Sequence, residues 1–217
     1  MRYRGAHKLP QWLETGAPIL LDNRKDDVEA ALRDVHGSIC LEIGCGKGGF
    51  LQQMAALYPD WMFIGIDKML AVLAKGAAGA VERNLPNVLF IAGDIVYIAP
   101  KLPQGGVDRI FLNFSDPWPR RRHHERRLTH ASKLALYQDL LSEHGVVEQK
   151  TDNRDLFEWS ISSFSNNGWN VERVERGFAV GEPLPSNLSS QYVQTEYEAK
   201  FRANGQPIYY LLARPPR

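Results

Sequence analysis

A short hydrophobic segment that runs directly into a glycine-rich turn restricts the fold of this chain more than any other feature. Residues 38–43 (SICLEI) have the character of a buried strand, and Gly44-Cys-Gly-Lys-Gly-Gly49 follows them. Residues 50–57 then show helical spacing and end before Pro59. A strand, a glycine turn and a helix in this order are typical of the first unit of a parallel α/β sheet.

The rest of the chain repeats the alternation of strand and helix. We expect further strands at 61–66, 88–92, 107–113, 146–150, 170–174 and 207–212, and further helices at 28–35, 69–84, 132–142, 156–167 and 196–203. A Pro/Ser/Asn-rich connection is expected at 181–191. This spacing predicts βαβ units and a mostly parallel sheet. It also predicts one domain over residues 38–217, preceded by a basic and polar extension over residues 1–37.

The composition fits a single globular domain. The 217 residues are 44% hydrophobic and 24% charged, which excludes a disordered chain. No apolar run approaches the roughly 18 residues of a membrane span, and no apolar stretch follows the basic residues 1–8, so neither a membrane partner nor a signal peptide is expected. Cys40 and Cys45 are too few and too close for a disulfide framework or a zinc site. The sequence therefore favours a reducing cytoplasm and predicts no metal.

Acidic residues lie at the ends of three consecutive predicted strands. Glu42 lies two residues before Gly44, Asp67 follows the strand 61–66, and Asp94 follows the strand 88–92 after one glycine. Because parallel strands end at one edge of the sheet, we expect all three carboxylates around the glycine turn. Asp67 could accept the hydroxyl groups of a ribose, and Asp94 could accept a proton from an adenine amino group. The alternative for Asp94 is a helix cap.

The glycine turn itself admits two kinds of ligand. Gly44, Gly46 and Gly49 fit the dinucleotide-binding pattern, whereas Gly44, Gly46 and Gly48 fit the pattern of nucleoside-dependent methyltransferases. A carboxylate at Glu42 would repel a pyrophosphate but suits a ligand with an ammonium group, such as the methionine part of S-adenosylmethionine. A plain structural turn, with Glu42 capping a neighbouring helix, is the alternative.

The segment Asn113-Phe-Ser-Asp-Pro-Trp-Pro119 follows the fourth strand. Its two prolines stiffen the backbone around Asp116 and Trp118. A carboxylate beside an aromatic ring can hold a purine base by its edge and its face. A core position for Trp118 and a plain turn at Asp116 are the alternative. Since the segment lies where the ligand pocket should open, Asp116 is the candidate catalytic residue.

A basic run follows this loop. Five arginines and two histidines lie within Arg120–Arg127, opposed only by Glu125. With 26 Lys and Arg against 25 Asp and Glu, the whole chain has a net charge of only +1, so the run is a local excess. Such a density of arginines favours contacts with nucleic-acid phosphates over a solvated helix face. The two histidines fit this surface better than a metal site.

Together these stretches resemble the bacterial tRNA (guanine-N7)-methyltransferases. The resemblance runs from about residue 40 to residue 210 in the family's order, and the segment Asn113–Arg127 is its most specific part. The matching stretches are LEIGCGKG (41–48), GID (65–67), 113–127, KTDN (150–153), TEYE (195–198) and GQPIY (205–209). The resemblance implies a Rossmann-like S-adenosylmethionine-dependent methyltransferase fold, with a mostly parallel, doubly wound sheet and an antiparallel C-terminal strand. It implies transfer of a methyl group from S-adenosylmethionine to N7 of a guanine in the variable loop of tRNA.

The resemblance also implies a role for each matching position. The cofactor would be bound by Glu42, Gly44, Gly46, Asp67, Asp94 and Asp116. The substrate guanine and its surroundings would be bound by Arg120, Asp152, Thr195, Glu196, Tyr197 and Glu198, and the tRNA backbone would contact Arg122, His123, His124, Glu125, Arg126 and Arg127. Asp67 stands where the family often has Glu, and Arg120 where it often has Lys.

Three other functions stay open. A methyltransferase that acts on an exocyclic base amine is one, since Ser-Asp-Pro-Trp is loosely similar to the acidic Pro-Pro-aromatic loop of such enzymes. A nicotinamide-dependent oxidoreductase is disfavoured by Glu42. A non-catalytic RNA-binding module on the same fold would predict a damaged donor pocket, but here the glycines and acids of that pocket are intact.

Overall fold

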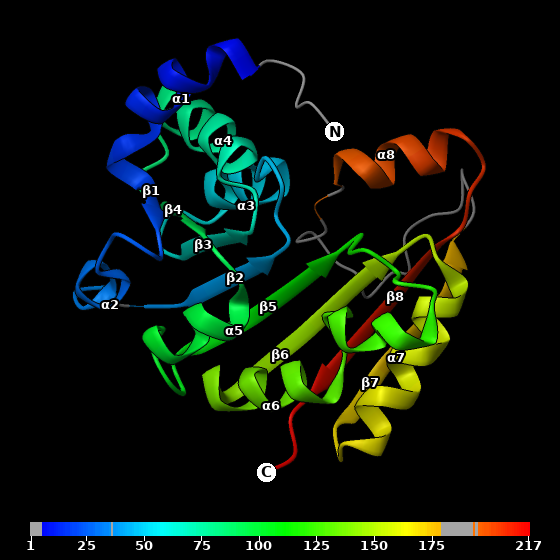
Figure 1. Cartoon of the computed structure of the whole chain (residues 1–217). Coiled ribbons are helices and arrows are strands. Elements are labelled where there is room, and N and C mark those ends of the chain that lie inside the picture. The colour runs from blue at the N-terminus through cyan, green and yellow to red at the C-terminus, as the bar shows by residue number, and fades with distance from the viewer. Residues whose placement is uncertain (1–5, 36, 179–192, 194) are drawn as a thin grey trace.

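The strands form one sheet in the order β1-β4-β3-β2-β5-β6-β8-β7 (Figure 1). The computed structural model describes residues 6–35, 37–178, 193 and 195–217. In this part of the chain the strands are β1 (Leu20–Asp22), β2 (Ile39–Ile43), β3 (Met62–Asp67), β4 (Val88–Ala92), β5 (Val107–Asn113), β6 (Leu141–Thr151), β7 (Asn170–Phe178) and β8 (Ile208–Arg214). Strands β1 to β6 pair in parallel, whereas β8 pairs antiparallel with both β6 and β7. The predicted mostly parallel sheet with an antiparallel C-terminal strand is confirmed.

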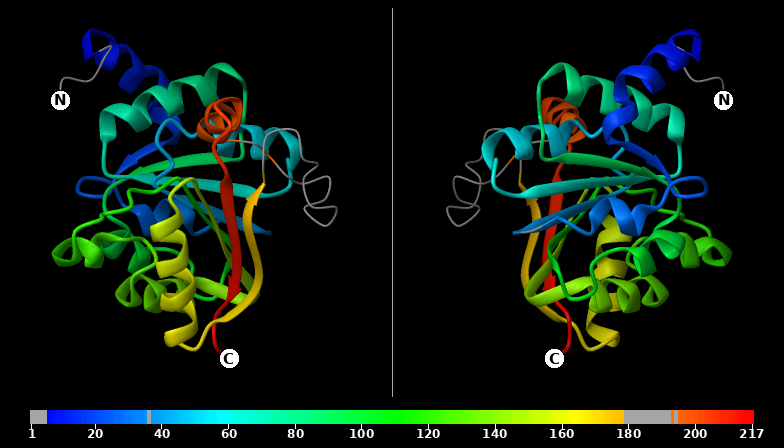
Figure 2. Two further views of the ribbon diagram at one scale, coloured as in Figure 1. Left: turned by 90° about the vertical axis from the view of Figure 1, so that its right-hand side faces the viewer. Right: turned by 90° about the vertical axis from the view of Figure 1, so that its left-hand side faces the viewer.

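Helices cover both faces of this sheet (Figures 1 and 2). On one face lie α1 (Leu9–Gly16), α3 (Gly49–Leu57) and α4 (Leu70–Glu82); on the other lie α2 (Val28–Leu32), α5 (Ile95–Ile98), α6 (Ala131–Leu140) and α7 (Arg154–Asn166). Helix α8 (Glu196–Ala203) lies beside the carboxyl ends of β5 and β6. Short 3-10 helices are found at Ala6–Lys8, Ala17–Ile19, Ala99–Lys101 and Arg121–Arg126.

The alternation of side chains along the strands divides the core into two parts. One buried cluster includes Leu41 and Ile64 and packs against α2, α5, α6 and α7. The other includes Cys40 and Phe63 and packs against α3 and α4. Because side chains two residues apart share a face of the sheet, Glu42 points to the same side as Cys40, toward α3 and the glycine turn.

The amino-terminal segment adds a strand to the sheet. β1 pairs in parallel with β4, with Leu20 opposite Phe90. Helix α1 packs so tightly on α4 that a Cβ atom on Gly16 would lie 2.8 Å from the Cβ atom of Ala77. Of these amino-terminal elements the sequence predicted only α2, because β1 has three residues, too few for a recognisable alternation. The predicted domain boundary at residue 37 stays a prediction.

The other elements begin and end close to their predicted positions. The largest difference concerns β6, predicted at 146–150 and observed over Leu141–Thr151. Polar residues at 142–144 interrupt the apolar pattern, although Ser142 is held by a hydrogen bond of 3.0 Å to Asp108 of β5. The connection expected at 181–191 lies outside the described residues.

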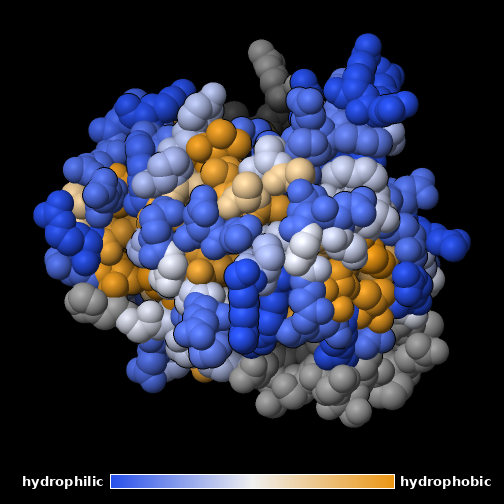
Figure 3. All heavy atoms as spheres, turned by 90° about the horizontal axis from the view of Figure 1, so that it is seen from below, coloured by the Kyte–Doolittle hydropathy of each residue, from blue (hydrophilic) through white to orange (hydrophobic). Residues whose placement is uncertain are grey.

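The longest helices in the described part of the chain, α4 and α7, have 13 residues each, and none there has the length and apolar character that crossing a membrane requires. Figure 3 views the molecule from below: hydrophilic side chains predominate on this face, and hydrophobic ones gather in patches between them.

Candidate active site

The glycine turn lies between β2 and α3 and is tied to the neighbouring strand. The backbone N–H groups of Gly44 and Cys45 donate to the carbonyl oxygen of Ile66 at 2.7 and 3.2 Å. Gly46 has a φ of +56° and nothing within 4 Å of the position where a Cβ atom would lie, whereas a Cβ atom on Gly48 would lie 2.4 Å from the ring of Phe90. Gly48 is thus required by packing, and Gly46 leaves open space at the predicted cofactor position.

The side chains of Glu42 and Asn113 are buried together and hydrogen-bonded, at the ends of β2 and β5. The Asn113 side-chain N–H donates to one carboxylate oxygen of Glu42 at 2.8 Å. The second carboxylate oxygen and the Asn113 side-chain oxygen are buried and accept no hydrogen bond from the described residues. Burial raises the pKa of Glu42 to about 8. Two buried oxygens without a donor, on residues that bind each other, fit a ligand that brings N–H donors and positive charge, as an ammonium group does.

Asp67 and Asp94 lie at the ends of β3 and β4, as predicted, and both bind backbone N–H groups. The carboxylate of Asp67 accepts from Gly46 at 3.1 Å and from Met69 at 2.9 Å, so it braces the glycine turn. Asp94 caps α5 by accepting from the N–H of Val96 at 3.1 Å and pairs with Lys68 at 2.7 Å. Burial opposes ionisation of Asp94, but these two partners outweigh it and lower its pKa. The helix-cap alternative for Asp94 is therefore present.

Exposed apolar side chains stand next to these two acids. The large hydrophobic side chains exposed in the described part of the chain are those of Leu57, Met69, Val96 and Tyr97. Met69 follows Asp67 by two residues, and Tyr97, which is 70% exposed, follows Asp94 by three. An apolar surface beside carboxylates suits a flat, partly polar ring such as a nucleobase. The sequence reasoning did not single out these apolar residues.

The loop after β5 has a strained backbone, and Arg127 holds it in place. Phe114 and Trp118 have φ values of +51° and +41°, a region that costs non-glycine residues about 1–3 kcal/mol each. Arg127 donates to the carbonyl oxygens of Pro117 at 2.9 Å and Trp118 at 3.3 Å. Asp116 lies between the two strained residues and is exposed. The loop therefore presents the predicted catalytic carboxylate to solvent on a braced backbone.

Arg127 departs from the prediction that it contacts RNA. Its side chain is only 4% exposed, and its guanidinium group lies 4.6 Å from the centre of the Trp159 ring. Its donors are directed at the loop carbonyls, so Arg127 positions the Asp116 loop instead of facing a phosphate. The burial of Arg127 could not be predicted from the sequence, because nothing in the run Arg120–Arg127 distinguishes a buried arginine from an exposed one.

The remaining basic residues form an open surface over the 3-10 helix Arg121–Arg126. The side chains of Arg120, Arg121, Arg122, Glu125 and Arg126 are exposed, and those of His123 and His124 are half-buried. Arg126 stacks over the ring of Trp118 at 4.8 Å, and His123 meets the edge of that ring at 5.8 Å. The predicted basic surface is thus contiguous with the Asp116 loop.

The predicted substrate residues divide into exposed and buried positions. Asp152 is half-buried in the turn between β6 and α7. Thr195 caps α8, since its hydroxyl oxygen accepts from the N–H of Glu198 at 3.0 Å. Glu198 is fully buried, and its carboxylate lies 3.4 Å from the ammonium group of Lys150. The side chains of Glu196 and Tyr197 lie outside the description.

Glu198, which is predicted to bind the guanine, has its carboxylate buried against the ammonium group of Lys150. Asn113, Lys68 and Lys150 are contacts that the sequence reasoning missed. The signal for Asn113 and Lys150 was their place at the ends of apolar strands, where a polar residue is not needed for packing.

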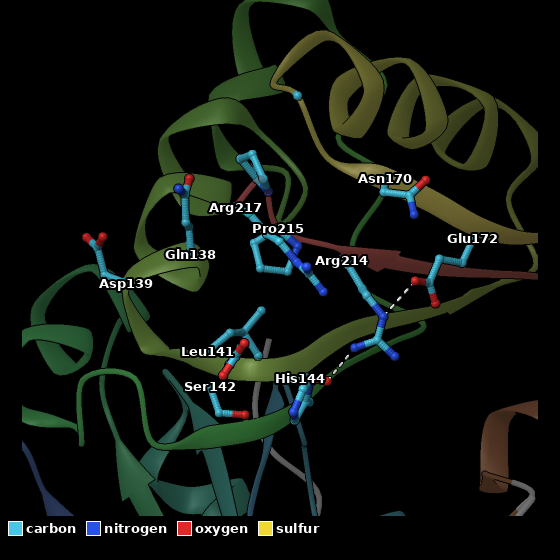
Figure 4. A pocket seen from close by; sticks show the side chains of 13 residues that line it. Gln138, Asp139, Leu141, Ser142, His144, Asn170, Glu172, Arg214, Pro215 and Arg217 are labelled. Atoms are coloured by element: carbon cyan, nitrogen blue, oxygen red, sulfur yellow. Dashed lines mark hydrogen bonds and ion pairs between the residues drawn. The ribbon is translucent and has the colours of Figure 1, made fainter.

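A separate hollow of about 1090 Å³ lies at the amino ends of β6 and β7, far along the strands from the glycine turn (Figure 4). There Arg214 donates to Glu172 at 2.6 Å and to the carbonyl oxygen of His144 at 2.5 Å. It contains none of the predicted site residues. Among the described residues, no group of three or more His, Cys, Asp or Glu side chains is placed to hold a metal ion.

Comparisons with known proteins agree with this arrangement. The family model described as "Putative methyltransferase" matches residues 36–211. A tRNA (guanine-N(7)-)-methyltransferase of Lactococcus lactis subsp. cremoris (strain SK11) is 39% identical over 99% of this chain and 98% of its own length. The enzyme of the same name from Pediococcus pentosaceus is 43% identical over 81% of this chain and 80% of its own length.

Solved structures support the fold. The antibiotic-resistance methyltransferase Kmr has a TM-score of 0.60 at 18% identity, over 88% of this chain and 92% of that one. The 16S rRNA methyltransferase KamB has a TM-score of 0.60 at 14% identity, over 86% of this chain and 92% of that one. The methyltransferase fold is therefore confirmed, and the match over nearly the whole length of the relatives shows that the chain belongs to the bacterial tRNA (guanine-N7)-methyltransferase family.

Proposed function

We propose that this protein transfers a methyl group from S-adenosylmethionine to N7 of a guanine in the variable loop of tRNA. The observation that carries the proposal is the 39% identity to a tRNA (guanine-N(7)-)-methyltransferase over 99% of the chain. The site geometry supports it, because strand-end acids, an open glycine position and an exposed loop carboxylate meet at one edge of the sheet. A tRNA substrate is in keeping with the predicted cytoplasmic location.

The residues around the glycine turn fit the methyl donor. The unpaired oxygens of Glu42 and Asn113 would accept from its ammonium group, and the open space at Gly46 leaves room for the backbone to approach it. Asp67 would bind the ribose hydroxyls and Asp94 the adenine amino group. When bound, S-adenosylmethionine supplies a methyl group on a positively charged sulfur.

The proposed reaction requires little from the protein beyond placement and charge. Guanine N7 has an in-plane lone pair and no proton, so methylation there needs no general base. The product ring is positively charged, and the carboxylate of Asp116 would stabilise that charge as it develops. Asp152 would accept from guanine N–H groups.

The exposed arginines would bind the tRNA backbone. Arg120, Arg121, Arg122 and Arg126 are exposed on one short segment beside Asp116. Each arginine that meets a phosphate releases condensed cations, so binding should weaken as salt increases. This surface would position the RNA, and the loop and substrate residues would select the base.

Replacement of the neighbouring residues Arg126 and Arg127 is expected to affect different properties of the protein. Arg126→Ala should flatten the plot of log affinity for tRNA against log salt concentration by about 0.7 to 0.9, because one phosphate contact is lost. Arg127→Ala should leave that slope unchanged but lower the free energy of unfolding by about 1–3 kcal/mol, since the carbonyl groups of Pro117 and Trp118 lose their donor. Salt-dependent tRNA binding and chemical denaturation of both variants check this. Equal slopes in the wild type and Arg126→Ala would contradict a phosphate contact at this position.

Transfer of a labelled methyl group tests the proposed function. The purified protein should label unmodified tRNA in the presence of methyl-labelled S-adenosylmethionine, and digestion should release the label as 7-methylguanosine. Label on an exocyclic amine would favour the alternative class of base methyltransferase. Binding of tRNA with no label would favour the RNA-binding module.

A further inference from the structure

A buried lysine lies between the donor pocket around Glu42 and helix α8. The side chain of Lys150, near the end of β6, is 5% exposed. Its ammonium group donates to the carbonyl oxygen of Val193 at 3.0 Å and lies 3.4 Å from the carboxylate of Glu198. In the sheet, Lys150 is the register partner of Asn113, which in turn donates to Glu42. The lysine therefore lies between the donor pocket and α8.

The two partners of Lys150 stand on either side of Thr195. Val193 precedes that residue by two positions, and Glu198 follows it by three. The Thr195 hydroxyl oxygen accepts from the N–H of Glu198 at 3.0 Å. The ammonium group thus binds one residue before Thr195 and one residue after it, and so holds Thr195 in place.

The backbone of Lys150 also holds the Asp116 loop. Its carbonyl oxygen accepts from the N–H of Phe114 at 2.8 Å, at the residue where the chain turns into the Asp116 loop. The Phe114 ring stacks on Phe201 of α8, with 5.7 Å between ring centres. One residue thereby fixes the start of the Asp116 loop and the start of α8 relative to each other.

Several carboxylates surround this ammonium group. Burial lowers the pKa of Lys150, while Glu198, Glu148 and Glu42 favour its charged form. On the same face of the sheet, the hydroxyl of Tyr210 and the guanidinium of Arg109 bind Glu148. Glu198 faces this ammonium group from α8, so removal of Lys150 would take one positively charged partner away from a fully buried carboxylate.

We propose that Lys150 is a positioning residue of the substrate site: it binds Val193 and Glu198 and so holds α8 and Thr195 where the guanine is to be bound. The role given to Glu198 changes accordingly, from a ligand of the base to the anchor of α8. This inference rests on the proposed function, because it takes the Thr195–Glu198 segment as part of the tRNA site.

Lys150→Met is the direct test, with three readouts on the full-length protein. The amide hydrogens of α8 should exchange about tenfold faster than in the wild type. The KM for tRNA should rise about 10- to 100-fold through misplacement of the site. The Kd for S-adenosylmethionine, measured by calorimetry, should change less than the KM for tRNA, although the charge of Lys150 also acts on Glu42. Lys101→Met is the matched control, since that lysine also binds a carbonyl and an amide oxygen, but both belong to Asn23 and neither to the segment that leads into α8.

The double variant Lys150→Met/Glu198→Gln separates positioning from simple stability. It removes the charge of the buried Glu198 side chain together with that of Lys150, so it should regain most of any thermal stability that Lys150→Met loses. If Lys150 positions α8, fast exchange of α8 and the high KM should persist in this variant. Return of both values to those of the wild type would overturn the proposal, as would unchanged α8 exchange in Lys150→Met. A wild type that does not methylate tRNA would contradict the proposed function instead, and the exchange data would still test the anchor.

Discussion

Asp116→Ala is expected to reduce the rate of methyl transfer to tRNA by about 100- to 1,000-fold, the usual effect of removing one group that stabilises transition-state charge. Asp116 is exposed on a loop whose backbone is fixed by Arg127 and by the conformations of Phe114 and Trp118. Affinity for tRNA should stay the same or increase, because the variant removes a negative charge from the protein surface that is proposed to bind tRNA. Single-turnover transfer at saturating donor, together with tRNA binding, measures both effects.

Two further variants make this result specific. Asp116→Asn keeps the shape and removes the charge, so it should be nearly as slow as Asp116→Ala. Asp60→Ala removes an exposed carboxylate at the opposite end of the strands, in the turn before β3, and should transfer at the wild-type rate. Full activity in Asp116→Ala would remove this acid from the mechanism.

Binding of S-adenosylmethionine near pH 7 is expected to release about one proton, because Glu42 changes from neutral to charged. In the free protein burial raises the pKa of Glu42 to about 8, so the carboxyl group is mostly protonated at pH 7. An ammonium group beside it favours the ionised form. Donor affinity should therefore rise by up to about tenfold per pH unit up to about pH 8. Calorimetry in buffers of different ionisation enthalpy measures the released proton.

Glu42→Gln should abolish the proton release and weaken donor binding by about 30- to 150-fold, through loss of a charge-assisted hydrogen bond. For the free protein, the effect of pH on stability has the opposite sign to its effect on donor affinity. The raised pKa favours the folded state at low pH, and this contribution is lost between the ordinary pKa of 4.5 and about 8. The Gln variant should not show this decline in stability. Tighter binding of NAD than of S-adenosylmethionine by the wild type would overturn the assignment of the donor.

The strand-end acids illustrate what could be predicted from the sequence. Glu42, Asp67 and Asp94 each lie at the end of an apolar run, and parallel pairing alone brings such positions to one edge of the sheet. Only the order of the elements is needed to predict that these carboxylates lie together.

Contacts between distant segments could not be predicted in the same way. Arg127 and Arg126 are neighbours in one basic run, but only packing against Trp159 and the Pro117 carbonyl decides which of them is buried. Likewise, the pairing of Glu198 with Lys150 joins residues 48 positions apart. β1 was missed for a related reason, since three residues become a strand only because β4 offers an edge.

Chemical cleavage of tRNA at 7-methylguanosine tests the central claim most directly. Borohydride reduction followed by aniline cuts the chain at this nucleotide, so it reports the methylated atom and its position together. Unmodified tRNA incubated with the protein and S-adenosylmethionine should be cut once, in the variable loop, and the same reaction with Asp116→Ala should give almost no cut. Methyl incorporation without cleavage, or cleavage only outside the variable loop, would contradict the account.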